Sequence, residues 1–308
     1  MINIVGKRYF YFAFSLLIII PGLIIILLDG LPLSIDFTGG TLLEVSFESG
    51  TPPQPAEIVA LYKGLGVDDI LVQTTNRGSL VARSSFLSDE TRSQVVSQME
   101  EQFLQPVTVL RYDSVGPTIG EEVTSRAALA VGVAAIAVLI YIVFAFRGIQ
   151  NAARYGVCGI IAMLHDVLIV ISLAAIGGLL WNWQVDALFL TALLTVIGFS
   201  VQDKIVVFDR IRENSTIFRR LRFESLVNHS IVQTLQRSIN TQLMTVEFML
   251  LALVLFGGVT LREFSLILLV GLLSGTYSSI FIAAPILVVW ENREWKNWFK
   301  PRASKMPA

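Results

Sequence analysis

The sequence predicts an α-helical membrane protein with six transmembrane helices and, between the first two of them, an external α+β domain of the ferredoxin-like kind. Three observations predict this fold class. Of the 308 residues, 54% are hydrophobic and 15% are charged, whereas a soluble domain carries about 25% charged residues. Six apolar stretches reach the length of about 20 residues that a membrane span needs. The segment 29–126, in contrast, is polar and long enough to bury a small core.

The apolar stretches define the domain organisation. We expect spans over residues 9–28, 127–146, 155–181, 187–208, 239–259 and 264–290. The first span follows Lys7 and Arg8, as the apolar run of a signal peptide would, but it is long and no small-residue cleavage site follows it. We therefore expect a retained anchor (1–28), the external domain (29–126), a five-helix bundle (127–290) and a basic tail (291–308).

The orientation follows from the distribution of Lys and Arg, which are enriched in cytoplasmic loops. Basic residues gather before the first span, between the second and third, between the fourth and fifth, and after the sixth: Lys7, Arg8, Arg147, Arg154, Arg210, Arg212, Arg219, Arg220, Arg222, Arg293, Lys296, Lys300, Arg302 and Lys305. The loop 181–186 has no basic residue, and the loop after Gly258 has only Arg262. This alternation predicts that both termini are cytoplasmic.

The external segment shows strand and helix signals in turn. Residues 41–47 alternate apolar and polar side chains, as a half-buried strand does. We expect a helix over 55–65, strands over 70–75 and 79–86 around the turn at Asn76-Arg77-Gly78, a helix from an N-cap at Ser88 to Phe103, and a strand over 107–112. The order strand–helix–strand–strand–helix–strand is the split βαβ plan.

Several polar residues lie inside the expected spans. A charge in the middle of a bilayer costs about 2.5–3.5 kcal/mol on insertion scales, so such residues usually face a bundle interior or a water-filled cavity. They are His165, Asp166, Asp203, Lys204, Asp209, Arg237 and Glu247. Arg237, Thr241 and Thr245 recur every four residues and form one polar stripe. Such a stripe either lines a hydrated path or satisfies hydrogen bonds between helices.

Each of these residues has a structural and a functional interpretation. For Asp203, an acid in a long apolar helix, we favour function, because a proton-coupled machine needs a titratable group there. For Lys204 and Asp209 we favour pairing or snorkelling at the interface. For His165, Asp166 and Glu247 both interpretations stay open. Four glycines are expected to serve helix packing or bending: Gly198, Gly257, Gly258 and Gly275.

Other functional classes find little support in the sequence. One cysteine, Cys158, and two histidines far apart make no metal pattern. The net charge of −1 gives no basic bias toward nucleic acid. Outside the membrane we find no nucleophile–base pair and no phosphate loop. We expect neither an enzyme nor a cofactor.

A set of motifs spread along nearly the whole chain resembles the SecF family of protein-export subunits. The motifs are Asp36-Phe37-Thr38-Gly39-Gly40, Val115-Gly116-Pro117 with Gly120, the stretches 201–214 and 236–241, Leu255-Phe256-Gly257-Gly258, and the stretch 275–281. The related SecD family has a Phe-Glu-Arg-Ile run where this chain has Phe208-Asp209-Arg210-Ile211. Gln202 and Lys204 stand where many SecF sequences have Asn and Thr, so the resemblance leaves open where Asp203 titrates in this chain.

The resemblance implies half of an RND-superfamily transporter in the inner membrane. Such a subunit pairs with SecD near the SecYEG channel and uses the proton motive force to draw the exported polypeptide outward. Asp203 and Arg237 match the family positions assigned to proton transport, although a sodium-driven site would also need a carboxylate. Two alternatives remain: a structural scaffold whose intramembrane charges lock helices together, and a half-size RND exporter of small molecules.

Overall fold

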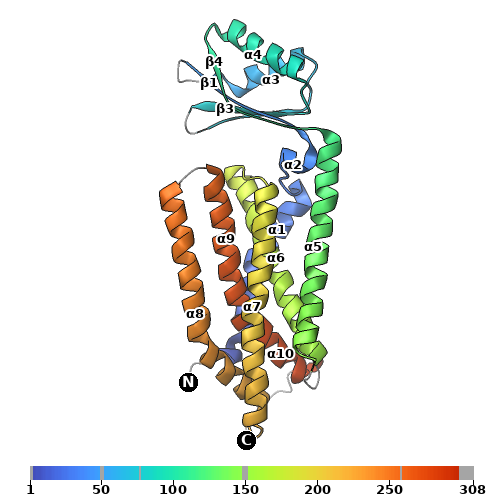
Figure 1. Cartoon of the computed structure of the whole chain (residues 1–308), viewed down its shortest axis with the longest axis vertical. Coiled ribbons are helices and arrows are strands. Elements are labelled where there is room, and N and C mark those ends of the chain that lie inside the picture. Colours follow the sequence, from blue (N-terminus) through green and yellow to red (C-terminus); the bar gives the residue numbers. More distant parts are fainter. Residues whose placement is uncertain (1–2, 49–51, 76–77, 148–151, 257–258, 298–308) are drawn as a thin grey trace, which may run out of the picture. The chain divides into compact units, whose positions relative to one another are not determined.

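The chain folds into two compact units, Met1–Pro32 with Ala130–Ala308, and Leu33–Leu129 (Figure 1). The structure is a computed structural model that describes residues 3–48, 52–75, 78–147, 152–256 and 259–297. We call the unit formed by Met1–Pro32 and Ala130–Ala308 the helical unit, and the unit Leu33–Leu129 the sheet unit.

Long helices build the helical unit, and α5 begins in the sheet unit. They are α1 (Arg8–Asp29) after the 3₁₀ turn η1 (Val5–Lys7), α5 (Pro117–Ala145), α6 (Ala152–Trp181), α7 (Ala187–Ile217), α8 (Phe223–Phe256) and α9 (Val259–Ser278). The π-helix η2 (Ser279–Ala283) joins α9 to α10 (Ala284–Glu291), and the 3₁₀ turn η3 (Glu294–Asn297) follows. Pro285 lies in the first turn of α10 and has no N–H to donate to the preceding turn, which fits the π-helix just before it.

Five helical stretches in the described part of the chain are long and apolar enough to cross a membrane. They are Val5–Asp29, Pro117–Ala145, Ala153–Trp181, Ala187–Ile217 and Leu261–Glu291. Five of the predicted spans therefore coincide with helices of sufficient length and apolar composition. The sixth, 239–259, is not among these stretches; it lies mainly in α8, which packs against α7 and α9 (Figure 1).

Two helices extend beyond their predicted ends. α7 continues past residue 208 to Ile217, and α5 starts at Pro117 rather than at 127. In both extensions, charged residues pair along the helix: Arg212 with Asp209 at 2.9 Å, and Arg126 with Glu122. Ion pairs between residues three or four positions apart stabilise a helix in these polar segments. A prediction from apolar residues alone therefore places the helix ends too close to the apolar run.

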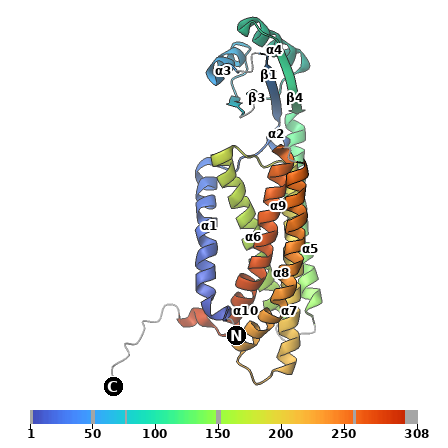
Figure 2. The same cartoon turned by 90° about the vertical axis from the view of Figure 1, so that its left-hand side faces the viewer.

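Small residues bring α7 against α9 and α1 against α6. A Cβ atom added to Gly275 would lie 3.2 Å from the Cα atom of Ser200, and one added to Gly22 would lie 2.5 Å from the Cα atom of Ser172. Figure 2 shows α1 running beside α6. Gly198 is different, because an added Cβ would meet nothing within 4 Å.

The sheet unit contains the predicted strands and helices. After the short α2 (Ile35–Thr38) come β1 (Gly40–Phe47), α3 (Pro55–Gly64), β2 (Ile70–Thr74), β3 (Ser79–Ser84), α4 (Asp89–Phe103) and β4 (Val107–Val115). The four strands lie in the order β2-β3-β1-β4, and every neighbouring pair is antiparallel. Part of the predicted turn, residues 76–77, lies outside the described residues.

The core of the sheet unit lies between the sheet and its two helices. Ser88 caps α4 as predicted, because its hydroxyl accepts a hydrogen bond from the Thr91 amide. Val95 and Met99 of α4 are fully buried together with Leu43 and Val45 of β1. A β-bulge between Glu44 and Val45 shifts the register of β1 against β4.

The two glycine motifs around the sheet unit pack against each other. Gly39 has a φ of +72°, and a Cβ atom there would lie 2.9 Å from the Cα atom of Pro117. A Cβ atom on Gly120 would lie 2.5 Å from the Gly39 nitrogen. The backbone of the Asp36–Gly40 motif therefore approaches the start of α5 so closely that only glycine fits.

We predict that Gly39→Ala weakens the junction of β1 with β4 by about 1–3 kcal/mol, since alanine is strained at this φ and collides with Pro117. Amide hydrogen exchange of the full-length protein should then accelerate in β1 and β4. Gly64→Ala is the matched control, because nothing lies within 4 Å of its added Cβ atom. Equal exchange in the two variants would contradict the account.

Candidate functional site

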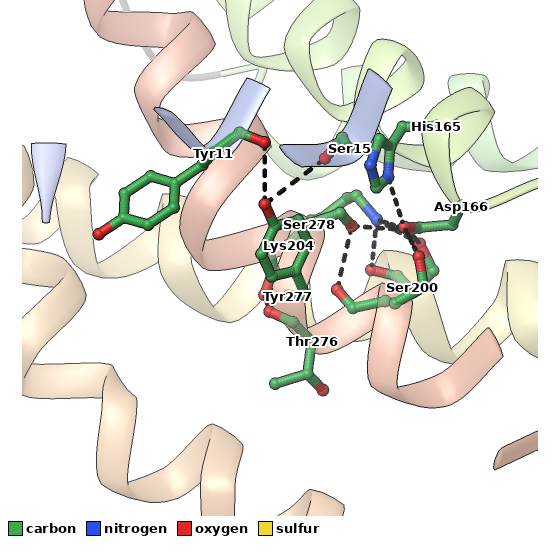
Figure 3. A network of polar contacts seen from close by, with 12 residues as sticks. Tyr11, Ser15, His165, Asp166, Ser200, Lys204, Thr276, Tyr277 and Ser278 are labelled. Carbon is green, nitrogen blue, oxygen red and sulfur yellow. Dashed lines mark hydrogen bonds and ion pairs between the residues drawn. The ribbon is translucent and has the colours of Figure 1, made fainter. Parts of the chain in front are cut away.

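The first polar centre of the helical unit surrounds the carboxylate of Asp166 on α6. Asp166 is 1% exposed and accepts hydrogen bonds from three serine hydroxyls. Ser200 of α7 and Ser278 of α9 donate to Oδ2, each at 2.6 Å, and Ser274 of α9 donates to Oδ1 at 2.8 Å. One carboxylate thus joins three helices (Figure 3).

Lys204 of α7 neutralises this carboxylate. Its ammonium nitrogen lies 2.8 Å from Asp166 Oδ2, and the side chain is 0% exposed. The ammonium also donates to the Ser200 carbonyl at 3.2 Å and contacts the Ser200 hydroxyl. Two charges buried this deeply are tolerated because each is paired and further hydrogen-bonded. Lys204 is therefore a buried partner of Asp166, and the pairing interpretation of this lysine is correct.

His165 adds a titratable ring to the same centre. Its Nδ1 lies 3.0 Å from Asp166 Oδ1, and its ring stacks on Tyr277 with centroids 6.1 Å apart. Tyr277 in turn donates to the carbonyl of Tyr11 on α1 at 3.0 Å. The Asp166 centre therefore reaches α1 through His165 and Tyr277 (Figure 3).

The second polar centre lies around Asp203 of α7. The Thr276 hydroxyl of α9 lies 2.7 Å from Asp203 Oδ2 and 2.9 Å from the side-chain oxygen of Gln242 on α8. A small cavity of about 10 Å³ adjoins them, and Thr241, Thr245 and Gly275 also line it. The structure thus brings together four of the predicted site residues: Asp203, Thr241, Thr245 and Gly275.

This second centre can hold Asp203 in either charge state. The Thr276 hydroxyl has one proton and faces two acceptor oxygens. When Asp203 is ionised, Thr276 donates to it, and the Gln242 amide must turn its NH₂ group toward Thr276. When Asp203 is protonated, its O–H donates to Thr276, which donates onward to Gln242. Within this centre, the rotation of one hydroxyl and one amide therefore satisfies the hydrogen bonds in both charge states.

Arg237 lies apart from Asp203. No ion pair within 4.0 Å joins the two among the residues that the structure describes. Arg237 instead lines a cleft of about 560 Å³ together with Gly198, Tyr141 and Gln202. Asp203 and Arg237, which match the family positions assigned to proton transport, are therefore not joined by a direct ion pair among the described residues, and Lys204, the neighbour of Asp203, pairs with Asp166.

The remaining predicted residues have less defined roles. The hydroxyls of Thr241 and Thr245 donate to backbone carbonyls of their own helix, at 2.9 and 3.1 Å. The Glu247 side chain, Gly257 and Gly258 lie outside the described residues. Five further residues of the two centres were not predicted from the sequence as site residues: Ser200, Ser274, Ser278, Thr276 and Gln242. Ser274 and Ser278 do stand four residues apart on α9, a spacing that places both hydroxyls on one face.

Two family profiles match the chain. The profile described as "Protein export membrane protein SecD/SecF, C-terminal" matches residues 95–293. The profile described as "SecD/SecF GG Motif" matches residues 24–51, which include Gly39 and Gly40. Together they cover the intramembrane polar centres and the glycine motif after α1.

Similar proteins include SecF subunits and a SecDF protein of known structure. The protein translocase subunit SecF of Anaerolinea thermophila is 69% identical over 308 residues and 100% of both chains. That of Thermobaculum terrenum is 46% identical over 97% of both. The crystal structure of SecDF, a translocon-associated membrane protein from Thermus thermophilus, matches with a TM-score of 0.80 and 34% identity, over 95% of this chain and 39% of the SecDF chain.

Proposed function

We propose that this chain, which belongs to the SecD/SecF family of protein export membrane proteins, takes up protons at Asp203 and uses their movement to assist polypeptide export. It is a protein translocase subunit of the SecF kind in the Sec export machinery. The observation that carries the proton proposal is the Asp203–Thr276–Gln242 chain, because it accommodates both charge states of the acid by rotation of side-chain groups.

Proton uptake changes the electrostatics between α7 and α8. Thr241 and Thr245 line the Asp203 cavity, and Arg237 lies one turn before Thr241 on the same helix. An ionised Asp203 attracts Arg237 more strongly through a bundle interior than it would through water. Arg237 keeps its proton, so protonation of Asp203 leaves it without this attraction and favours a movement of α8 against α7.

The membrane field can drive this step. Moving one charge through a potential of 100 mV is worth about 2.3 kcal/mol, which is comparable to the coupling energies that shift conformational equilibria in proteins. Each proton that reaches Asp203 from one side and leaves toward the other can therefore reset the position of α8. Export of the polypeptide would draw on this cycle after the ATP-driven stage.

The proposed partners are SecD, the SecYEG channel and the exported polypeptide. The pairing with SecD is supported by longer SecDF chains that contain a region similar to this protein. In the SecDF chain of Thermus thermophilus this region is 36% identical and makes up 39% of the chain. In that of Bacillus subtilis it is 35% identical and makes up 38% of the chain. We infer that this chain supplies the corresponding part as a separate subunit.

We also infer a topology of six spans in the cell inner membrane, with both termini in the cytoplasm. The alternation of basic loops supports it, and we assign the sixth span to α8, which packs against α7 and α9; Figure 1 shows α8 beside α9. The sheet unit is then an external ferredoxin-like domain. Its strand order supports this assignment, because β3 separates β1 from β2 and β1 separates β3 from β4.

A scaffold role has one specific observation in its favour, the Asp166–Lys204 pair, which is internally neutral and links α6 to α7. We assign the helix-locking role to that pair and proton coupling to Asp203. A half-size exporter of small molecules gains no support from these centres.

We predict that Asp203→Asn abolishes gradient-stimulated export in membrane vesicles that carry this chain with SecD, because an amide cannot cycle a proton. Arg237→Met should have the same effect. Asp209→Asn is the matched control on the same helix: Asp209 is exposed and pairs with Arg212 at 2.9 Å, a surface contact worth about 0–1 kcal/mol, so export should be unchanged.

The assay is run with an imposed proton gradient and, separately, with a sodium gradient. Stimulation by the proton gradient in the unmodified protein and its loss in Asp203→Asn are the expected results. Normal export by Asp203→Asn under a proton gradient would refute the role of this acid and favour the scaffold.

The topology is tested by labelling single cysteines from outside intact cells with a membrane-impermeant maleimide, in a Cys158→Ala background. Ser97→Cys, at an exposed position of α4, should react at once. Ser304→Cys should react only after the cells are permeabilised. The opposite pattern would invert the proposed orientation.

A further inference from the structure

His165 carries an unused acceptor or donor atom in the membrane. Its side chain is 8% exposed, and its Nδ1 contacts Asp166 Oδ1 at 3.0 Å. Its Nε2 atom is buried and has no hydrogen-bond partner among the described residues. Asp166 is an ionised acceptor paired with Lys204, so Nδ1 must carry the proton of the neutral ring. Nε2 is then a bare acceptor.

A cleft adjoins His165 on the side of α1. Its volume is about 220 Å³, and it is lined by His165 together with Ser15 of α1 and Ser274 and Tyr277 of α9, among apolar side chains. A water molecule occupies about 30 Å³ and needs two to four polar partners. The cleft has space for several, and the residues with polar groups in its otherwise apolar wall are Ser15, Ser274, Tyr277 and His165. Figure 3 shows His165 beside Ser15 and turned toward Asp166.

We propose that His165 is a second proton-accepting residue, which receives a proton from water in this cleft at Nε2 and so regulates the Asp166–Lys204 pair. The proposal rests on the proposed proton coupling and extends it to a second site. In the step, a hydronium ion gives its proton to the Nε2 lone pair and becomes water. The ring becomes an imidazolium that keeps its Nδ1–H bond to Asp166, and the centre gains one positive charge.

Protonation of His165 makes two cations compete for one carboxylate. Before it, Lys204 alone balances Asp166; after it, the imidazolium shares that role, and the Lys204 ammonium loses part of its attraction. Lys204 is adjacent to Asp203 on α7. Loosening Lys204 therefore changes the charge environment and the position of α7 at the second polar centre.

The surroundings of His165 are compatible with a cation. Asp166 on its own helix carries the negative charge, and Lys204 of α7 is the opposing positive group. On α9, the Tyr277 ring stacks with it at 6.1 Å, and an aromatic face attracts a cation. On α1, the side chains that line the cleft in the described part of the chain are Phe14, Ser15 and Ile18, none of them charged.

The first test reads the protonation of His165 directly. The chain has two histidines, so a His229→Gln variant labelled with ¹⁵N-histidine and assembled with SecD in lipid nanodiscs gives the ring signals of His165 alone. As the pH falls from about 8 to about 5, the range in which histidines titrate, we expect Nε2 to gain a proton while Nδ1 keeps its own. A ring that stays neutral throughout, or that carries its single proton on Nε2, would overturn the proposal.

The second test uses export by vesicles under a proton gradient. In His165→Asn, the side-chain NH₂ group replaces the Nδ1–H donor to Asp166, but nothing replaces Nε2. We expect loss of gradient-stimulated export with ATP-driven export and SecD assembly unchanged, whereas His229→Gln exports normally. Normal export by His165→Asn would overturn this inference. If Asp203→Asn still failed in the same vesicles, the proposed function would stand; if Asp203→Asn also exported normally, both would fall.

Discussion

The arrangement of the helical unit depends on the buried ion pair between Asp166 and Lys204. Neither charge could remain alone at this depth, since an unpaired buried charge costs several kcal/mol. The pair is completed by serine hydroxyls from α7 and α9, so α6, α7 and α9 must keep a fixed register for all of these groups to be satisfied. Gly275 allows the required approach of α9 to Ser200.

The pair also determines which acid is available for chemistry. Asp203 and Lys204 are consecutive residues on α7, and consecutive residues of a helix point about 100° apart. Lys204 turns to Asp166, and Asp203 faces Thr276 and Gln242. The carboxylate with an internal cation is suited to locking helices, and the carboxylate bound by a hydroxyl is suited to exchanging a proton. In our proposal, protonation of His165 makes the Asp166–Lys204 pair respond to protons as well.

Local signals in the sequence were enough to predict the elements. The apolar runs located five spans, the alternation at residues 41–47 located β1, and the N-cap at Ser88 located the start of α4. Partners across helices could not be predicted in this way. Lys204 was expected near the interface, and its contact with Asp166 depends on how α6 packs against α7. The contact of Asp203 with Thr276 could not be predicted for the same reason, because the sequence pattern of one helix does not fix its distance to another helix.

A double-mutant cycle tests the central pair most directly. The free energy of unfolding in mixed micelles is measured for the unmodified protein, Asp166→Asn, Lys204→Met and the double variant, with Lys63→Met at an exposed position as control. Each single substitution strands one buried charge and should cost about 3–5 kcal/mol. The double variant removes both charges and should be clearly more stable than the sum of the single losses predicts. Additive losses, equal within about 0.5 kcal/mol, would contradict the pairing on which the account depends.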